Sequence, residues 1–399
     1  MNETLLCLLV VVFAAMCIPM MLPGFVLMAQ RKGFTDNPNA RKLQQRPVSV
    51  LGGIVIASVI SITLACAHLF VNLDALFLAM TMLVTLMMIG MIDDAIDVHF
   101  LIKLFIQIFV VALLFFSGHY RILTFGGLFG VTALNTTVSC LVSIFVGVFI
   151  INAINFIDGI DGLASLVGVF IGIVVGTWSL HYGCIPHAVL SFAYVGALLG
   201  FFFFNAFSKK YKMYMGDSGS LILGLYVYLS VCEVLSPASY VNDITKHYHI
   251  SFAISWMALP AFDMVRVCLF RIMRGKSPFY PDRSHLHHQL VDWGLPDVTV
   301  CFILLFLNIL VVVVWLVTAS LGMGAFWQSM IVVAAAIVLI WVPAFQISYL
   351  QSYQKDRYER INMRFLRLNV RFQQVHNDLT RLIDTTPVLF KTLTRLKKQ

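Results

Sequence analysis

The chain has 399 residues, of which 60% are hydrophobic and only 12% carry a formal charge, and its net charge is +8. Ordinary soluble domains carry about a quarter charged residues, so this composition excludes a soluble globular protein and predicts an all-α, polytopic membrane protein. The eight cysteines stand singly, without the spacing that is typical of disulfide frameworks or metal sites.

A membrane-spanning helix needs roughly 20 apolar residues, and the sequence holds about eleven such stretches. Their expected bounds are 4–29, 50–72, 75–92, 100–117, 137–155, 163–181, 187–207, 218–236, 251–270, 298–320 and 325–349. The first stretch is too long for a signal-peptide core and lacks a small-residue cleavage site, so we interpret it as a retained span. We expect residues 1–350 to form one membrane-embedded domain and residues 351–399 to form a tail.

The basic residues indicate the orientation. When alternate loops are assigned to alternate sides, all lysines and arginines except Arg121 and Lys246 fall on one side. By the positive-inside rule that side is cytoplasmic, which places the N-terminus outside and the tail inside. The positive net charge therefore reflects topology and gives no reason to expect a nucleic-acid partner.

Aspartates gather on the same side, at or near the ends of spans. They are Asp93, Asp94, Asp97, Asp158, Asp161, Asp217 and Asp263. Carboxylates at a membrane boundary are costly and normally face a polar cavity with a partner. Converging carboxylates repel one another unless a cation binds them, and Mg²⁺ favours oxygen ligands that it shares with phosphate. We therefore expect a magnesium site; for any single aspartate, a helix cap or a topology marker is the alternative.

Two glycine-rich motifs on that face suit a phosphorylated substrate. In NFIDGIDG a glycine follows Asp158 and Asp161, which allows a ligand to approach the backbone closely. In YMGDSGS, Asp217 stands at the start of a span, where free amide groups favour anions. Both motifs predict contacts with phosphate groups.

The segment SPFYPDRSHLHH adds Arg283, which suits bidentate binding of phosphate, and three histidines that can donate to oxyanions. A zinc site is an alternative for His285, His287 and His288, although their spacing without a nearby cysteine suits a tetrahedral site poorly. Surface histidines without a role are the other alternative.

Together these motifs resemble the polyprenyl-phosphate N-acetylhexosamine-1-phosphate transferase family. The resemblance rests on DDAID from Asp93, NAINFIDGIDGLA from Asn152, MYMGDSGS from Met213 and PDRSHLHH from Pro281, in their order and spacing. The DDxxD form and the interrupted histidine run resemble the undecaprenyl-phosphate N-acetylglucosamine-1-phosphate transferase branch. The muramoyl-pentapeptide branch has lysine at the position of Asp97 and three adjacent histidines.

The resemblance implies that a lipid phosphate attacks the β-phosphorus of a UDP-N-acetylhexosamine, which we expect to be UDP-GlcNAc, and that UMP leaves. It also implies undecaprenyl phosphate as acceptor, Mg²⁺ as cofactor with Mn²⁺ as a substitute, and a bacterial inner membrane at the first membrane step of surface polysaccharide synthesis. UDP-MurNAc-pentapeptide or another UDP-hexosamine is the alternative donor, and a phosphorylated aspartate the alternative route. A cation-coupled secondary transporter is the alternative of another class, but such sites usually lie near the bilayer midplane.

The resemblance further assigns roles to single residues. The expected catalytic residues are Asp93, Asp94, Asp217 and His285. The expected metal ligands are Asp217, Asp161 and Asp94. The expected ligands of the lipid phosphate are Lys103, Asp93, Arg41 and Lys42, with a lysine that only snorkels to the interface as the alternative for Lys103. The expected contacts of the nucleotide sugar are Asn155, Asp158, Gly159, Asp161, Asn205, Tyr214, Arg283, His285, His287 and His288. The first cytoplasmic loop departs from relatives at Gln44 and Ser49, where His and Pro are common.

An apolar heptad pattern marks the tail. Steps of three and four residues join Tyr358, Ile361, Phe365, Leu368, Phe372, Val375, Leu379 and Leu382. This pattern predicts either a short coiled coil that joins two protomers or an amphipathic helix on the anionic inner leaflet. We favour a homodimer, and we expect Pro387 to end the helical pattern.

Overall fold

A computed structural model of the chain describes the backbone of residues 2–36, 47–131, 133–236, 249–278, 280 and 282–396, and their side chains except at 364, 366–372 and 387–396. In these residues helices dominate, and the two strands pair in an antiparallel ribbon. The strands are β1 (Thr35–Asp36) and β2 (Val48–Ser49). The helices are α1 (Glu3–Lys32), α2 (Gly52–His68), η1 (Asp74–Leu76), α3 (Phe77–Ile96), α4 (Phe100–Phe116), η2 (Leu128–Gly130), α5 (Thr136–Ile157), α6 (Leu163–His181), α7 (Ile185–Phe207), α8 (Gly216–Val234), α9 (His249–Trp256), α10 (Ala258–Met273), α11 (Leu286–Asp292), α12 (Asp297–Ser320), α13 (Ala325–Ala336), the π-helix η5 (Ile337–Trp341), α14 (Val342–Tyr353) and α15 (Lys355–Leu396).

Every predicted apolar stretch forms helix, because in a bilayer only internal hydrogen bonds satisfy the backbone. Among the described residues, 8 helices are long and apolar enough to cross a membrane, and the bent pair α9 and α10 brings the number to 9 if it is one span. The apolar helices α2 and α4 are shorter, at 17 residues each. The all-α, polytopic membrane fold is therefore confirmed, whereas the number of crossings and the orientation stay predictions.

Contacts divide the chain into two compact units. The first unit comprises Met1–Val110, Ala164–Tyr226 and Arg371–Gln399, and the second comprises Val111–Leu163 and Val227–Val370. Helices α4, α6, α8 and α15 contribute residues to both units. The predicted boundary between a membrane domain and a tail at residue 350 stays a prediction; the break between α14 and α15 falls at Gln354.

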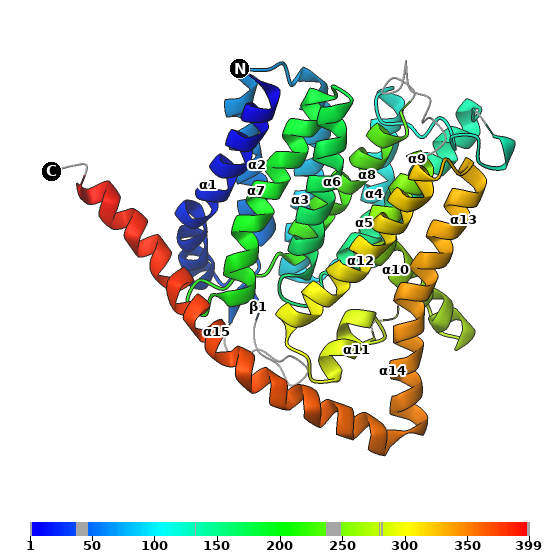
Figure 1. The fold of residues 1–399 in the computed structure, drawn as a ribbon. Helices are drawn as coiled ribbons and strands as arrows, with labels where there is room; N and C mark the ends of the chain where they lie inside the picture. The colour runs from blue at the N-terminus through cyan, green and yellow to red at the C-terminus, as the bar shows by residue number, and fades with distance from the viewer. Residues whose placement is uncertain are drawn as a thin grey trace. The chain divides into compact units, whose positions relative to one another are not determined.

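In the first unit, α1 packs along α7 and α2 (Figure 1). Two glycines of α7 allow this close approach. A Cβ atom at Gly196 would lie 2.3 Å from the backbone oxygen of Val11, and one at Gly200 would lie 3.0 Å from the backbone oxygen of Ala15. Small residues serve this purpose between membrane helices, because van der Waals packing drives the association of helices in lipid.

In the second unit, α9 and α10 meet at a bend of 73°. The bend frees backbone groups that a straight helix would pair, and the buried side chain of Asn308 on α12 provides their partners. Its Oδ1 accepts a hydrogen bond from the Leu259 N–H at 2.8 Å, and its Nδ2 donates to the Trp256 carbonyl at 3.0 Å. A polar side chain thus stabilises a break inside an apolar helix pair.

The tail helix α15 packs against its own chain. Within the second unit, the Trp293 ring lies against Tyr358 and Phe365, with centroids 6.1 and 5.5 Å apart. These two contacts occupy part of the predicted heptad seam. Val375 and Leu382 of the same seam are 58% and 62% exposed. The homodimer and the membrane-surface helix both stay predictions.

Within the first unit, the carboxylate of Asp384 on α15 accepts hydrogen bonds from the Ser208 hydroxyl and the Lys210 N–H, just after α7. The helix runs on through Pro387, so the expectation that this residue ends the pattern is wrong. Proline lacks an N–H group, but α15 continues to Leu396 without this donor.

Candidate functional site

The first unit brings together four predicted site residues: Asp93, Asp94, Lys103 and Asp217. Asp93 and Asp94 stand in the last turn of α3, which ends where Asp97 adopts a left-handed conformation with φ of 55°. The Asp93 carboxylate accepts a hydrogen bond from the Val98 N–H at 2.8 Å. This bond fixes the side chain to the turn between α3 and α4.

Lys103 of α4 joins two of these carboxylates. Its Nζ lies 2.7 Å from Oδ2 of Asp93 and 3.2 Å from Oδ2 of Asp217. The side chains of Lys103 and Asp217 are 24% and 29% exposed, so a ligand can reach both. An ammonium group has three donors, of which the carboxylates use two. One positive charge thus stands between two negative ones, and the third N–H of the ammonium group can donate to an anion.

Asp94 caps α8 from a different helix. Its Oδ1 accepts a hydrogen bond from the Asp217 N–H at 2.9 Å, and its Oδ2 accepts one from the Ser218 N–H at 3.3 Å. A carboxylate here satisfies N–H groups that have no partner within the helix and complements the helix dipole. Gly216, with φ of +69°, makes room, because a Cβ atom there would lie 2.6 Å from Oδ2 of Asp94. Asp94 therefore positions Asp217, and its role as a metal ligand stays a prediction.

Backbone hydrogen bonds fix the segment between α7 and α8. The Tyr214 N–H donates to the Ser49 carbonyl at 2.8 Å, and the Gly52 N–H donates to the Tyr214 carbonyl at 3.1 Å. Asn205, which was expected to support the nucleotide, donates from Nδ2 to the Met213 carbonyl at 2.9 Å. In this structure Asn205 thus supports the backbone beside Tyr214.

A pocket of about 180 Å³ lies beside Asp94 in the first unit. Lys32 lines one part of it, and Phe34, Leu51 and Met91 line others. Small-molecule sites typically measure about 300–1,000 Å³, so this pocket suits a phosphate group or a single ring better than a whole nucleotide sugar.

In the second unit, the NFIDGIDG motif follows the last turn of α5, where the Asp158 N–H donates to the Asn155 carbonyl at 3.2 Å. Gly159 lies directly against α11. A Cβ atom there would lie 2.3 Å from Nε2 of His287, so a side chain at this position would force the His287 ring to shift. The Asp161 carbonyl accepts a hydrogen bond from the Cys301 thiol of α12 at 3.4 Å. The glycine-rich motif and the histidine segment are therefore in contact.

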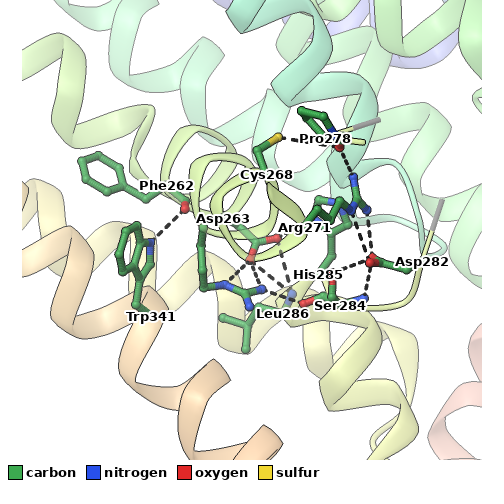
Figure 2. A network of polar contacts seen from close by, with 11 residues as sticks. Phe262, Asp263, Cys268, Arg271, Pro278, Asp282, Ser284, His285, Leu286 and Trp341 are labelled. Carbon is green, nitrogen blue, oxygen red and sulfur yellow. Dashed lines mark hydrogen bonds and ion pairs between the residues drawn. The ribbon is translucent and has the colours of Figure 1, made fainter. Parts of the chain in front are cut away.

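Asp263 of α10 organises the histidine segment (Figure 2). Its Oδ2 lies 2.8 Å from Nδ1 of His285, and its Oδ1 accepts a hydrogen bond from Nη2 of Arg266 at 2.6 Å. The His285 ring also packs edge-on against Phe156, with centroids 5.7 Å apart. From the sequence, Asp263 was one of the aspartates on the predicted cytoplasmic side and had no role of its own. An aspartate three residues before an arginine in an apolar helix is the signal that could have found this pair.

His287 and His288 carry no positive charge near neutral pH. Burial, followed by the neighbouring His288 and His285, lowers the pKa of His287 well below its ordinary value. Burial and the charge of Arg283 lower the pKa of His288 to about 4. These two rings can exchange hydrogen bonds with a ligand, but they do not neutralise a phosphate.

Arg283, which was expected to bind phosphate, pairs with Asp292, and its Nη2 lies 2.6 Å from Oδ1. Both side chains are partly exposed, at 50% and 38%. Nearby, Nη2 of Arg271 lies 2.8 Å from Oδ1 of Asp282. Burial alone would raise the pKa of Asp282, but its hydrogen bonds with Arg271 and Ser284 hold it well below its usual range. The loop before α11 is thus held by ion pairs.

The predicted residues form two groups, one in each unit. The first unit holds Asp93, Asp94, Lys103, Asn205, Tyr214 and Asp217. The second holds Asn155, Asp158, Gly159, Asp161, Arg283, His285, His287 and His288. Joint binding of a metal by Asp217 and Asp161 would draw on both units and stays a prediction.

In the part of the chain that the structure describes, no three His, Cys, Asp or Glu side chains form a group that could hold a metal ion. The zinc alternative for the histidines therefore has no support, and a magnesium ion would need further ligands from its substrate. Arg41, Lys42 and Gln44 lie outside the described residues.

Comparison with known proteins finds a family model and several relatives that this chain resembles. Residues 75–234 match the family model described as "Glycosyl transferase family 4". The undecaprenyl-phosphate alpha-N-acetylglucosaminyl 1-phosphate transferase of Escherichia coli (strain K12) is 29% identical over 270 residues, which cover 67% of this chain and 71% of the relative. The decaprenyl-phosphate N-acetylglucosaminephosphotransferase of Mycolicibacterium smegmatis is 30% identical over 293 residues, with 67% and 71% covered.

Proposed function

Because the chain belongs to the polyprenyl-phosphate N-acetylhexosamine-1-phosphate transferase family and is a membrane enzyme of that kind, we propose that it moves N-acetylglucosamine-1-phosphate from UDP-GlcNAc to undecaprenyl phosphate. An oxygen of the lipid phosphate forms a new bond to the β-phosphorus of the donor. The bond from that phosphorus to the bridging oxygen breaks, and UMP leaves with this oxygen. The product is a lipid diphosphate that carries the sugar.

The observation that carries the proposal is the position of Lys103 between Asp93 and Asp217. A phosphate monoester has its second pKa near 6, so the attacking lipid phosphate is already ionised at neutral pH and needs little help from a base. The main barrier is the approach of two anions, which positive charge near the transferred phosphate lowers. The Lys103 ammonium group supplies such a charge, and Asp93 holds it in place.

Mg²⁺ is the proposed cofactor, with Mn²⁺ as a substitute. The donor set fits this ion, because Mg²⁺ takes carboxylate oxygens from one or two residues and completes its shell with phosphate and water. Asp217 is accessible at the start of α8, and Asp161 follows the glycine of its motif; these two residues would hold the ion. When bound, Mg²⁺ neutralises charge on the diphosphate and on the leaving UMP.

In the second unit, the contact between Gly159 and His287 supports a role in binding the donor. It joins the two motifs that the family resemblance assigns to the nucleotide sugar. Because His287 and His288 are neutral, they suit the hydroxyl and amide groups of uridine and the sugar better than its phosphates. Arg283 would leave Asp292 to reach the diphosphate.

The proposed location is a bacterial inner membrane with the site on the cytoplasmic side. The distribution of lysine and arginine supports this orientation. The proposed role there is the first membrane step of surface polysaccharide synthesis, which gives the lipid-linked sugar that later enzymes extend.

The test is a transfer assay with purified protein, radiolabelled UDP-GlcNAc and undecaprenyl phosphate. We expect label in the lipid fraction that EDTA abolishes and Mg²⁺ restores, and that an Asp217→Asn variant fails to produce. UDP-GalNAc and UDP-MurNAc-pentapeptide serve as competing donors. Label from one of them but not from UDP-GlcNAc would overturn the choice of donor, and label from none would overturn the reaction.

A further inference from the structure

The Asp263 carboxylate is buried, at 1% exposure (Figure 2). In the described part of the chain, its hydrogen-bond partners other than His285 are all donors. Arg266 donates to Oδ1 from Nη2 at 2.6 Å and from Nε at 3.2 Å. The Leu286 N–H donates to the same oxygen at 3.2 Å. Each of these groups can only donate, which favours the ionised carboxylate as acceptor. The nitrogen of His285 at 2.8 Å from Oδ2 must then carry a proton as well.

This contact determines which nitrogen of His285 is left for a ligand. With Nδ1–H on Asp263, Nε2 is an acceptor when the ring is neutral and a donor when it is protonated. Two aromatic contacts fix the plane of the ring. Phe156 lies edge-on at 5.7 Å, and the His287 ring lies nearly parallel with its centroid at 5.5 Å.

Arg266 compensates the charge of Asp263 and also holds the backbone next to His285. Its side chain is 4% exposed, and its charge compensates that of Asp263 inside the protein. It also donates from Nη2 to the Ser284 carbonyl at 2.8 Å, which ties the chain directly before His285 to α10. Asp263 thus holds the His285 ring and the Leu286 N–H, and its partner Arg266 holds the Ser284 carbonyl.

We propose that Asp263 is a positioning residue for the transfer reaction: it holds the His285 ring so that Nε2 faces the sugar-phosphate part of the UDP-hexosamine. This inference rests on the proposed function. Carboxylates orient histidines in the same manner in catalytic triads and around metal ions, where one ring nitrogen is fixed so that the other can act.

The test compares Asp263→Asn, His285→Gln and the double variant in the transfer assay. Asparagine keeps the size of the side chain but turns an amide donor toward groups that are themselves donors. By analogy with other oriented histidines, we expect kcat/KM for the donor to fall about 10- to 100-fold in each single variant. In the double variant kcat/KM should fall no further than in His285→Gln alone. The loss should divide between kcat and KM in the same proportion as in that single variant.

Asp74→Asn is the control, because it also replaces an aspartate that lies near a histidine, with Oδ1 3.9 Å from Nε2 of His68, but at an exposed position in the first unit. We expect it to keep kcat/KM within about threefold, well short of the loss in Asp263→Asn. Losses of kcat/KM that multiply in the double variant, or an equal loss in Asp74→Asn, would overturn the positioning role.

A second readout does not depend on catalysis. In protein labelled with ¹⁵N-histidine, the signal that His285→Gln removes should show a proton on Nδ1, and Asp263→Asn should shift or broaden that signal. A neutral ring protonated on Nε2 alone would overturn the inference. If the wild type transferred no UDP-hexosamine, the proposed function would fail, while this spectrum would still decide whether Asp263 fixes the ring.

Discussion

Lys103 pairs with two carboxylates in the first unit. A lysine at the end of a membrane helix would be expected to extend toward water, which is the alternative for this residue. Instead its ammonium group lies between Asp93 and Asp217, residues far apart in the sequence. An ammonium group held by two carboxylates is placed before the substrate binds, so little reorganisation is needed when the phosphate arrives.

Replacing Lys103 by Met should therefore lower kcat/KM about 100-fold or more, because a preorganised cationic donor is lost while the apolar stem is kept. The measurement is the initial rate of lipid labelling. Lys210→Met is the control, because the Lys210 ammonium group lies over the Tyr211 ring and is exposed. Equal losses in the two variants would contradict a specific role of Lys103.

The lowered pKa values of His287 and His288 predict a pH-dependent stability. Between about pH 6.5 and 4, the unfolded chain binds protons that these buried rings do not bind in the fold. The free energy of unfolding should therefore fall as the pH falls through this window, by up to about 1.4 kcal/mol per pH unit for each ring and about twice that for both. Thermal unfolding in detergent at several pH values measures this slope. His288→Gln should flatten it, and an unchanged slope would contradict the prediction.

At the scale of elements, Gly159 shows why the glycine-rich motif and α11 form a single surface. Any side chain at this position would meet the His287 ring, whose Nε2 lies 2.3 Å from the place of a Cβ atom. The His287 side chain is itself buried, at 1% exposure. The absence of a side chain at 159 is thus a packing requirement between two segments far apart in the sequence.

Gly159→Ala should lower the free energy of unfolding by about 1–3 kcal/mol through overpacking, and should lower kcat/KM as well. Gly24→Ala is the control, since a Cβ atom there meets nothing within 4 Å. In a His287→Ala background, Gly159→Ala should lower the free energy of unfolding by much less. A full loss in that background would show that the contact with His287 is not the cause.

The break between α9 and α10 depends on Asn308. Asn308→Leu leaves the Leu259 N–H and the Trp256 carbonyl without this partner, which should cost about 1–3 kcal/mol. Thr318→Val on the same helix is the control, because the Thr318 hydroxyl donates only to carbonyls of its own helix. Unfolding titrations of both variants measure the difference, and a smaller loss in Asn308→Leu than in the control would contradict this role.

For the whole molecule, the sequence predicts the helices well because long apolar stretches allow few alternatives in a bilayer. The predicted spans coincide with described helices to within a few residues, with α9 and α10 as one bent pair. The bend itself was not predicted, because its stabilising partner, Asn308, lies on another helix. The course of α15 through Pro387 was also missed, because local propensity alone disfavours it.

The sequence motifs predicted which residues form the site, but they did not predict several of the contacts between those residues. The motifs identified Asp93, Lys103 and Asp217, which the first unit brings together. They did not reveal that Asp94 caps α8 or that Asp263 holds His285, since both contacts join segments far apart in the sequence. Such pairings depend on tertiary packing that a single sequence does not specify.

The most direct measurement uses UDP-GlcNAc that carries ³H in the sugar and ³²P in the β-phosphate. After incubation with the purified protein, undecaprenyl phosphate and Mg²⁺, the lipid fraction should contain both labels in equal molar amounts, and unlabelled UMP should be released. Transfer of ³H without ³²P would contradict a sugar-1-phosphate transferase. Absence of both labels from the lipid would contradict the proposed reaction itself.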